Sequence, residues 1–130
     1  MKKRYFISGQ LLIITLFILI TPQLLSGQSI SWTGSGDGIS WSDGDNWSSD
    51  SVPGSGSDVV IDVNADSAFS IEVNQEQTVE NLDLTSRDAN LVLNSDLNVT
   101  SDYYQNFSTL SGSADLIVDG TLFFDNGLMS

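Results

Sequence analysis

The sequence predicts an all-β protein, and three observations support this. Short runs of alternating apolar and polar residues fill the chain after residue 27, and none shows the 3.6-residue periodicity of a helix. Asn, Asp, Ser and Gly separate these runs, as expected where strands end and the backbone turns. A pattern of two such runs also recurs along the chain, which is typical of a solenoid. These observations favour a parallel β-helix, with a β-sandwich as the alternative.

Residues 1–27 are predicted to be a secretory signal peptide. A basic start at residues 2–4 is followed by the apolar run Leu11–Ile20, and the small residues Ser26 and Gly27 favour cleavage before Gln28. The chain has no Cys, so a lipid anchor at this position is excluded. An uncleaved membrane anchor is the alternative, because the segment is just long enough to span a bilayer. We expect a secreted or cell-surface protein.

Removal of the signal peptide leaves a strongly acidic chain. Arg87 is then the only cation beside 17 acidic residues, which gives a net charge of −16. Nucleic acids are excluded as partners, because few basic residues remain to neutralise phosphates. Anionic lipid is excluded for the same reason, so no membrane contact is expected after cleavage.

Residues 28–58 are predicted to form a compact cap rich in Trp, Gly and Asp. Trp32, Trp41 and Trp47 supply large apolar surfaces that a loop-rich segment needs for burial. The interspersed glycines allow tight turns of the backbone. Pro53-Gly54 then marks a turn before the first firm strand, which begins at Val59.

The order of residues in this segment resembles the opening of large secreted bacterial proteins of the adhesin-like or autotransporter-passenger-like kind. The residues that carry the resemblance are Trp32, Gly34, Gly36, Gly38, Trp41, Asp43, Asn46-Trp47, Pro53, Asp58 and Val59-x-Ile61. The resemblance implies the start of a right-handed parallel β-helix at a cell surface. Ser57 stands where that family often has Gly. G8-type modules of secreted proteins share the sparser part of the pattern and are a second possibility.

Residues 59–130 are predicted to form the coils of the β-helix. The alternating runs are Val59–Val63, Phe69–Val73, Val79–Leu84, Leu91–Leu93, Leu97–Val99, Leu116–Val118 and Leu122–Phe124.

A repeat of 25 residues is the basis for expecting stacked coils. Leu91-x-Leu93 and Leu97-x-Val99 recur, 25 residues later, as Leu116-x-Val118 and Leu122-x-Phe124. Such a shift would let side chains stack on their counterparts in the next coil. Ile71-x-Val73 with Leu82-x-Leu84 is predicted to be an earlier, less regular coil.

The coils are expected to be incomplete at the C-terminus. Only six residues follow Leu122–Phe124, too few to cover the last coil. An open β edge beside apolar side chains favours pairing with other chains. The expected partner there is downstream chain or another protein.

The residues after 27 offer little catalytic chemistry. They contain no His, Cys or Lys, which removes the commonest general base, thiol and Schiff-base chemistry, and the usual zinc ligands. No Ser-His-Asp arrangement is possible, and 17 acidic residues give no reason to select one pair. We therefore expect no enzyme activity and no cofactor.

Two binding interpretations of the cap remain. Asp37, Asp43 and Asp45 are calcium candidates, because hard cations prefer oxygen ligands, although their spacing does not match an EF-hand. The three tryptophans form a structural cap or, alternatively, stack on a surface glycan. The sequence thus predicts a non-catalytic, secreted structural or adhesin-like module. The alternative is a carbohydrate-binding or carbohydrate-active β-helix module.

Overall fold

The computed structural model describes residues 27–130, so the predicted signal peptide lies, apart from Gly27, outside the described residues. This part of the chain holds twelve strands, one 3₁₀ helix and no α-helix, which confirms the all-β prediction. The 3₁₀ helix is η1 (Gly44–Asn46). The strands are β1 (Gln28–Ser31), β2 (Ser57–Ile61), β3 (Phe69–Val73), β4 (Gln77–Val79), β5 (Asn81–Leu84), β6 (Ala89–Leu93), β7 (Leu97–Val99), β8 (Tyr103–Asn106), β9 (Thr109–Gly112), β10 (Leu116–Val118), β11 (Leu122–Asp125) and β12 (Leu128–Met129).

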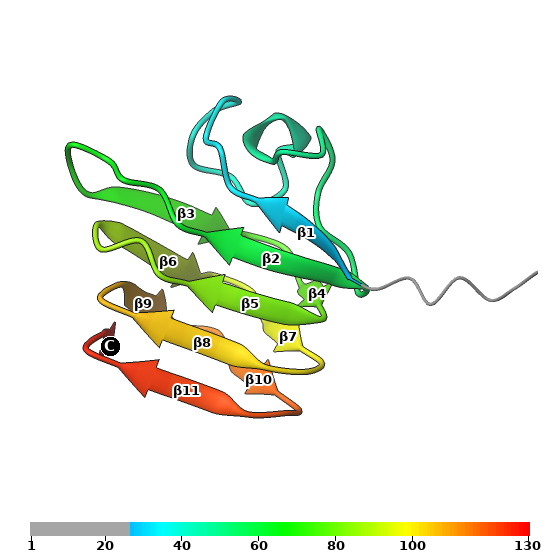
Figure 1. Cartoon of the computed structure of the whole chain (residues 1–130), viewed down its shortest axis with the longest axis vertical. Helices are drawn as coiled ribbons and strands as arrows, with labels where there is room; N and C mark the ends of the chain where they lie inside the picture. The colour runs from blue at the N-terminus through cyan, green and yellow to red at the C-terminus, as the bar shows by residue number, and fades with distance from the viewer. Residues whose placement is uncertain (1–26) are drawn as a thin grey trace, which may run out of the picture.

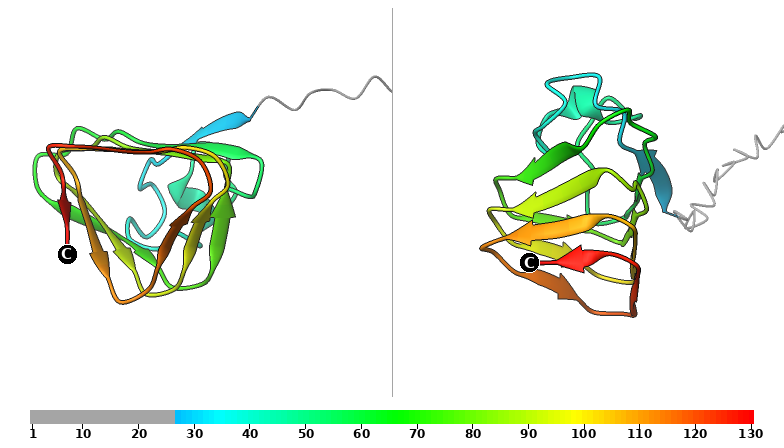
Figure 2. Two further views of the ribbon diagram at one scale, coloured as in Figure 1. Left: turned by 90° about the horizontal axis from the view of Figure 1, so that it is seen from below. Right: turned by 90° about the vertical axis from the view of Figure 1, so that its left-hand side faces the viewer.

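The strands form three parallel sheets that wind into a solenoid of about four turns (Figure 1). The front sheet has the order β1-β2-β5-β8-β11, the second sheet β10-β7-β4, and the third sheet β12-β9-β6-β3. Viewed along the stack, the coils superimpose as a three-sided ring (Figure 2). The predicted parallel β-helix is confirmed, and the β-sandwich alternative is wrong, because a sandwich is built of antiparallel sheets.

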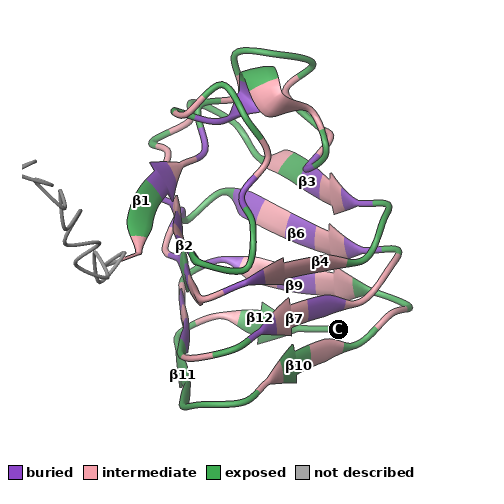
Figure 3. Ribbon diagram, turned by 90° about the vertical axis from the view of Figure 1, so that its right-hand side faces the viewer, coloured by how far each residue is buried: buried purple, intermediate pink, exposed green. Residues whose placement is uncertain are grey.

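The core lies inside this ring and consists of columns of residues from successive coils. Val59, Leu82 and Tyr103 are in register on the front sheet, and none is more than 1% exposed. On the third sheet, Ile71 pairs with Leu91, and both are fully buried. Alternate residues of each strand point away from the core, so buried and partly exposed positions alternate along the middle coils (Figure 3).

The spacing of the coils differs from the expected 25-residue repeat. Leu91 pairs with Leu110, which is 19 residues further along the chain. Leu97 pairs with Leu116 at the same spacing. Leu91 and Leu116 lie in different sheets. The 25-residue repeat therefore does not describe the stacked coils, and that prediction is wrong.

Strand β9 explains the error. Gly112 of β9 stands opposite Leu93, so Leu110 is the only large apolar residue of this strand. Gly112 has φ of +127°, and a Cβ there would collide with the backbone of Leu93. Glycine is therefore required at this position. Because glycine has no apolar side chain, β9 lacks the apolar–polar alternation by which strands are recognised in a sequence. Without β9 in the pattern, the run at 116–118 falls in phase with Leu91–Leu93, although it pairs with Leu97–Val99 in another sheet.

The earlier coil was predicted in part. Ile71–Val73 does stack on Leu91–Leu93. Leu82–Leu84 does not stack on Leu97–Val99, because it lies between β2 and β8 in the front sheet. The run expected at Val79–Leu84 also breaks into β4 and β5, which belong to different sheets. A polar corner residue separates them, and the chain turns from one side of the ring to the next.

Candidate functional site

The three tryptophans form a cluster above the first coil. Trp32, Trp41 and Trp47 are 4%, 0% and 1% exposed and belong to the same hydrophobic core as the coils. The Trp47 ring lies between the other two, with centroids 4.9 Å from Trp32 and 4.7 Å from Trp41. Both contacts have edge geometry, which the quadrupoles of aromatic rings favour. The loop that carries the cluster covers the upper end of the stack (Figure 1). We call residues 32–52 the tryptophan cap.

A buried amide organises the cap. Asn46, at the end of η1, is fully buried. Its Oδ1 accepts hydrogen bonds from the N–H groups of Gly36 (3.0 Å) and Gly38 (2.9 Å). Its Nδ2 donates to Asp37 Oδ1 (2.8 Å) and to the carbonyl of Ser40 (3.0 Å). The amide thus uses both donors and its acceptor, as a buried polar group must.

Two aspartates complete this network. Asp37 Oδ1 also accepts from the N–H groups of Ile39 and Ser40, each at 2.8 Å. Hydrogen bonds from Ser40, first from its side chain, hold the pKa of the Asp37 carboxyl well below its usual value. Asp43 Oδ2 accepts from the Asp37 N–H (2.9 Å), and its Oδ1 accepts from the Asp45 N–H (3.2 Å). These carboxylates therefore fix the turns of the cap.

The calcium interpretation receives no support from this arrangement. Asp37 and Asp43 direct oxygens at backbone N–H groups, and Asp45 is exposed. Within residues 27–130, no group of three or more acidic side chains is placed so that it could hold a metal ion.

Burial of the tryptophans favours the cap interpretation over glycan stacking. A ring that is at most 4% exposed has no free face for a sugar. Trp47 Nε1 donates to the carbonyl of Trp41 at 2.8 Å, whereas Trp41 Nε1 is buried without a partner in the described part of the chain. A hollow of about 220 Å³ beside the cap is lined by Trp32 and Phe69, among others. Trp32 is only 4% exposed, so its ring has no free face toward this hollow.

Carboxylates are the only abundant ionisable groups of the described residues. Asp83, on the outward side of β5, has a raised carboxyl pKa, first because of partial burial and second because of the negative charge of Asp58. Asp83 stands opposite Val60 and Tyr104, neither of which is an acid. The outward face of this sheet therefore offers hydrogen-bond acceptors, and the charges of Asp58 and Asp83 on it interact with each other.

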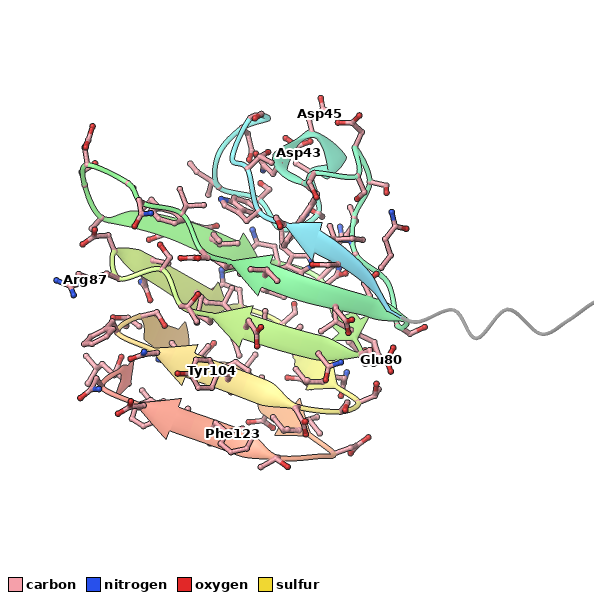
Figure 4. All side chains as sticks on the ribbon, viewed as in Figure 1. Asp43, Asp45, Glu80, Arg87, Tyr104 and Phe123 are labelled. Atoms are coloured by element: carbon pink, nitrogen blue, oxygen red, sulfur yellow. The ribbon has the colours of Figure 1, made fainter. Side chains whose placement is uncertain are left out.

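The outward face of the front sheet was missed by the sequence reasoning. Tyr104 and Phe123 pair in register on β8 and β11, with ring centroids 6.4 Å apart (Figure 4). Phe123 is 52% exposed. The doublets Tyr103-Tyr104 and Phe123-Phe124 break the apolar–polar alternation, and this signal could have identified aromatic residues on the outward face.

The lower end of the stack is open. Leu122 and Phe124 occupy the columns of Tyr103 and Gln105, which are fully buried, yet they are 49% and 45% exposed. Every residue of β11 and β12 is exposed, and no residue of β10 is buried (Figure 3). A hollow of about 330 Å³ at this end is lined by residues 110–112 of β9, by Met129 and Ser130, and by Leu93, Ala114 and Leu116.

Comparisons with known protein families, with curated protein sequences and with solved structures found no match to this chain. Among the described residues, no helix has the length and apolar character needed to cross a membrane.

Proposed function

We propose that this chain is a non-catalytic structural module of a secreted or cell-surface protein, and that it forms the capped start of a β-helix. The observation that carries the proposal is the closed upper end of the stack. There, three buried tryptophans and the Asn46 network cover the first coil. Solenoids need such caps, because an uncovered coil exposes apolar side chains and unpaired strand edges.

The cap also supports an adhesin-like or autotransporter-passenger-like origin over a G8-type module. Trp32, Trp41 and Trp47 are three of the residues on which that resemblance depends, and all three are packed together. Asn46, another of them, holds the cap turns. The resemblance therefore falls on residues with a clear structural role.

A catalytic role is not proposed. Residues 27–130 lack His, Cys and Lys, and the Asp37 and Asp43 carboxylates are engaged in fixing the turns of the cap. Release of reducing sugar from neutral or acidic polysaccharides by the purified chain would contradict this part of the proposal.

Export is tested by producing the full chain in a bacterium with a standard secretory pathway. The expected product outside the cytoplasm begins at Gln28, as measured by mass spectrometry. A reporter protein fused after Gly27 serves as the control for the signal alone. A chain that keeps residues 1–20 and stays with the membrane would contradict the proposal.

The lower end is proposed to take up a further coil of β-strand-forming polypeptide. Leu122 and Phe124 continue buried columns but lack neighbours on one side, and the lower edges of β10, β11 and β12 offer backbone donors and acceptors. The chain alone is expected to associate as its concentration rises. A monomeric mass in light scattering, with a melting transition independent of concentration, would contradict this part.

A further inference from the structure

The outward face of the front sheet carries a row of side chains that the core does not use. Register places Val60, Asp83, Tyr104 and Phe123 side by side on β2, β5, β8 and β11. Neighbouring strands are about 4.8 Å apart, so the row runs across the sheet with one side chain at each step. We call these four residues the outer row.

The lower half of the outer row is an aromatic surface. The Tyr104 and Phe123 rings are tilted by 52° with centroids 6.4 Å apart, and both project from the sheet (Figure 4). Tyr104 is half-buried and Phe123 is 52% exposed. Tyr104 lies on β8, whose inward residues Tyr103 and Gln105 are fully buried, and β8 pairs in register with the strand that carries Phe123. Tyr104 is therefore a contact that needs little ordering before a ligand binds.

The upper half of the outer row borders a hollow of about 400 Å³. It is lined by Asp58, Asp83 and Asp102, with Asn81, Ser29 and residues 59–60 between them. Asn81 is already used, since its Nδ2 donates to Asp58 Oδ1 and its Oδ1 accepts from the Asp102 N–H. The remaining polar groups are therefore mainly carboxylate acceptors.

We propose that this face binds a neutral polysaccharide, whose chain crosses the strands along the outer row. A sugar ring has an apolar face that fits Tyr104 and Phe123 and hydroxyl donors that fit Asp83 and Asp58. Mixed aromatic and acceptor surfaces of this kind bind ligands through a few placed polar groups. The site goes beyond the structural role proposed above and does not involve the buried tryptophans.

The acidic and aromatic character of this face argues against the two other ligand classes considered, anionic polymers and basic polypeptides. An anionic polymer would meet only carboxylates, in a chain whose described residues include a single cation, Arg87. A lysine-rich polypeptide would match the carboxylates. However, its strongly hydrated ammonium groups match the aromatic half of the row, Tyr104 and Phe123, less well than the apolar face of a sugar does. The neutral sugar chain matches both halves.

The test is affinity electrophoresis of the purified chain in gels that contain mixed-linkage β-glucan, galactomannan, polygalacturonate or poly-L-lysine. Retardation is expected on at least one of the neutral polymers. Tyr104→Ala and Phe123→Ala should each weaken that binding about tenfold, the effect expected for loss of one ring contact, and Asp83→Asn should weaken it as well.

Phe107→Ala is the matched control. Phe107 is 47% exposed but lies at a corner, where the Arg87 guanidinium is 5.0 Å from its ring centroid. This variant should bind like the original chain, and all variants should keep its circular dichroism spectrum. Binding to the neutral polymer should also persist at high salt.

Three outcomes would overturn the proposal. The first is no retardation on either neutral polymer. The second is binding that Phe107→Ala weakens as much as Phe123→Ala does. The third is retardation on poly-L-lysine alone, abolished by salt, which would assign the face to a basic polypeptide.

Discussion

Replacement of Trp47 by Ala is expected to lower the free energy of unfolding by about 3–5 kcal/mol, the range for removal of a large core aromatic side chain. Trp47 is the centre of the tryptophan cap. Its ring is 1% exposed and contacts both Trp32 and Trp41. Among the described residues, Trp47 is the only side chain of the cap that makes edge contacts with both other tryptophans.

The magnitude follows from three losses. The first is burial of the ring itself, which supplies most of the effect. The second is two edge contacts with centroids 4.9 Å and 4.7 Å apart, each contributing about 0.5–1.5 kcal/mol beyond burial. The third is the 2.8 Å hydrogen bond to the Trp41 carbonyl, about 1 kcal/mol. We therefore expect a value in the upper half of the range.

Urea unfolding followed by two signals measures this effect. Tryptophan fluorescence reports on the cap, because all three tryptophans lie there, and far-ultraviolet circular dichroism reports on the coils. Phe107→Ala is the control, because its ring is 47% exposed and both Phe and Ala carry a Cβ, so the substitution leaves the strain of the +60° φ in place. Its expected change is within about 0.5 kcal/mol.

A change of less than about 1 kcal/mol for Trp47→Ala would refute the cap interpretation. If glycan binding were lost at the same time, Trp47 would instead be a binding platform. The two interpretations therefore give opposite results in one variant.

Three further predictions concern the cap and the coils. Asn46→Asp should destabilise the chain by about 2–4 kcal/mol, because a carboxylate cannot donate a hydrogen bond to Asp37. Asn64→Asp adds the same charge in an exposed loop and should change the stability little. Urea unfolding of the two variants compares these effects. The lowered pKa of Asp37 means that its ionised carboxylate stabilises the fold above its usual pKa of 3.8, and this contribution is lost as pH falls below that value. The melting temperature of Asp37→Asn should therefore fall less between about pH 5 and pH 3 than that of the original chain, and equal slopes would contradict the argument. Gly112→Ala should lower the melting temperature strongly, because the added Cβ collides with the backbone of β6. Gly54→Ala, at a position with open space around it, should not. A similar effect of the two substitutions would show that the contact between β9 and β6 is not tight.

The fold class could be predicted from the sequence because the alternation within a strand is local. Burial inside the ring requires an apolar residue at every second position, and runs such as Leu91–Leu93 and Leu97–Val99 show this directly. The cap was visible for a similar reason. Trp41 and Trp47 stand in a loop-rich segment, where such large apolar surfaces require a common place of burial.

The hydrogen-bond network of the cap could not be predicted in the same way. Asn46 and Asp37 are ordinary polar residues in an Asn- and Asp-rich segment. Only the folded loop brings the Asn46 amide within 3.0 Å of the Gly36 and Gly38 N–H groups and makes it a buried centre. The same residue types elsewhere, such as Asn64, stay exposed.

By itself, the sequence determined that the chain forms strands, that they stack as a solenoid and that the three tryptophans need a common place of burial. Only the tertiary structure decided which runs share a sheet, because pairing depends on contacts between residues 19 or more positions apart. Gly112 hid one strand, so the coil spacing could not be counted along the chain. The outer row is likewise a tertiary feature. Asp83, Tyr104 and Phe123 become neighbours only when parallel pairing sets three coils in register, because strand alternation fixes the face of each residue but not its partner on the next strand.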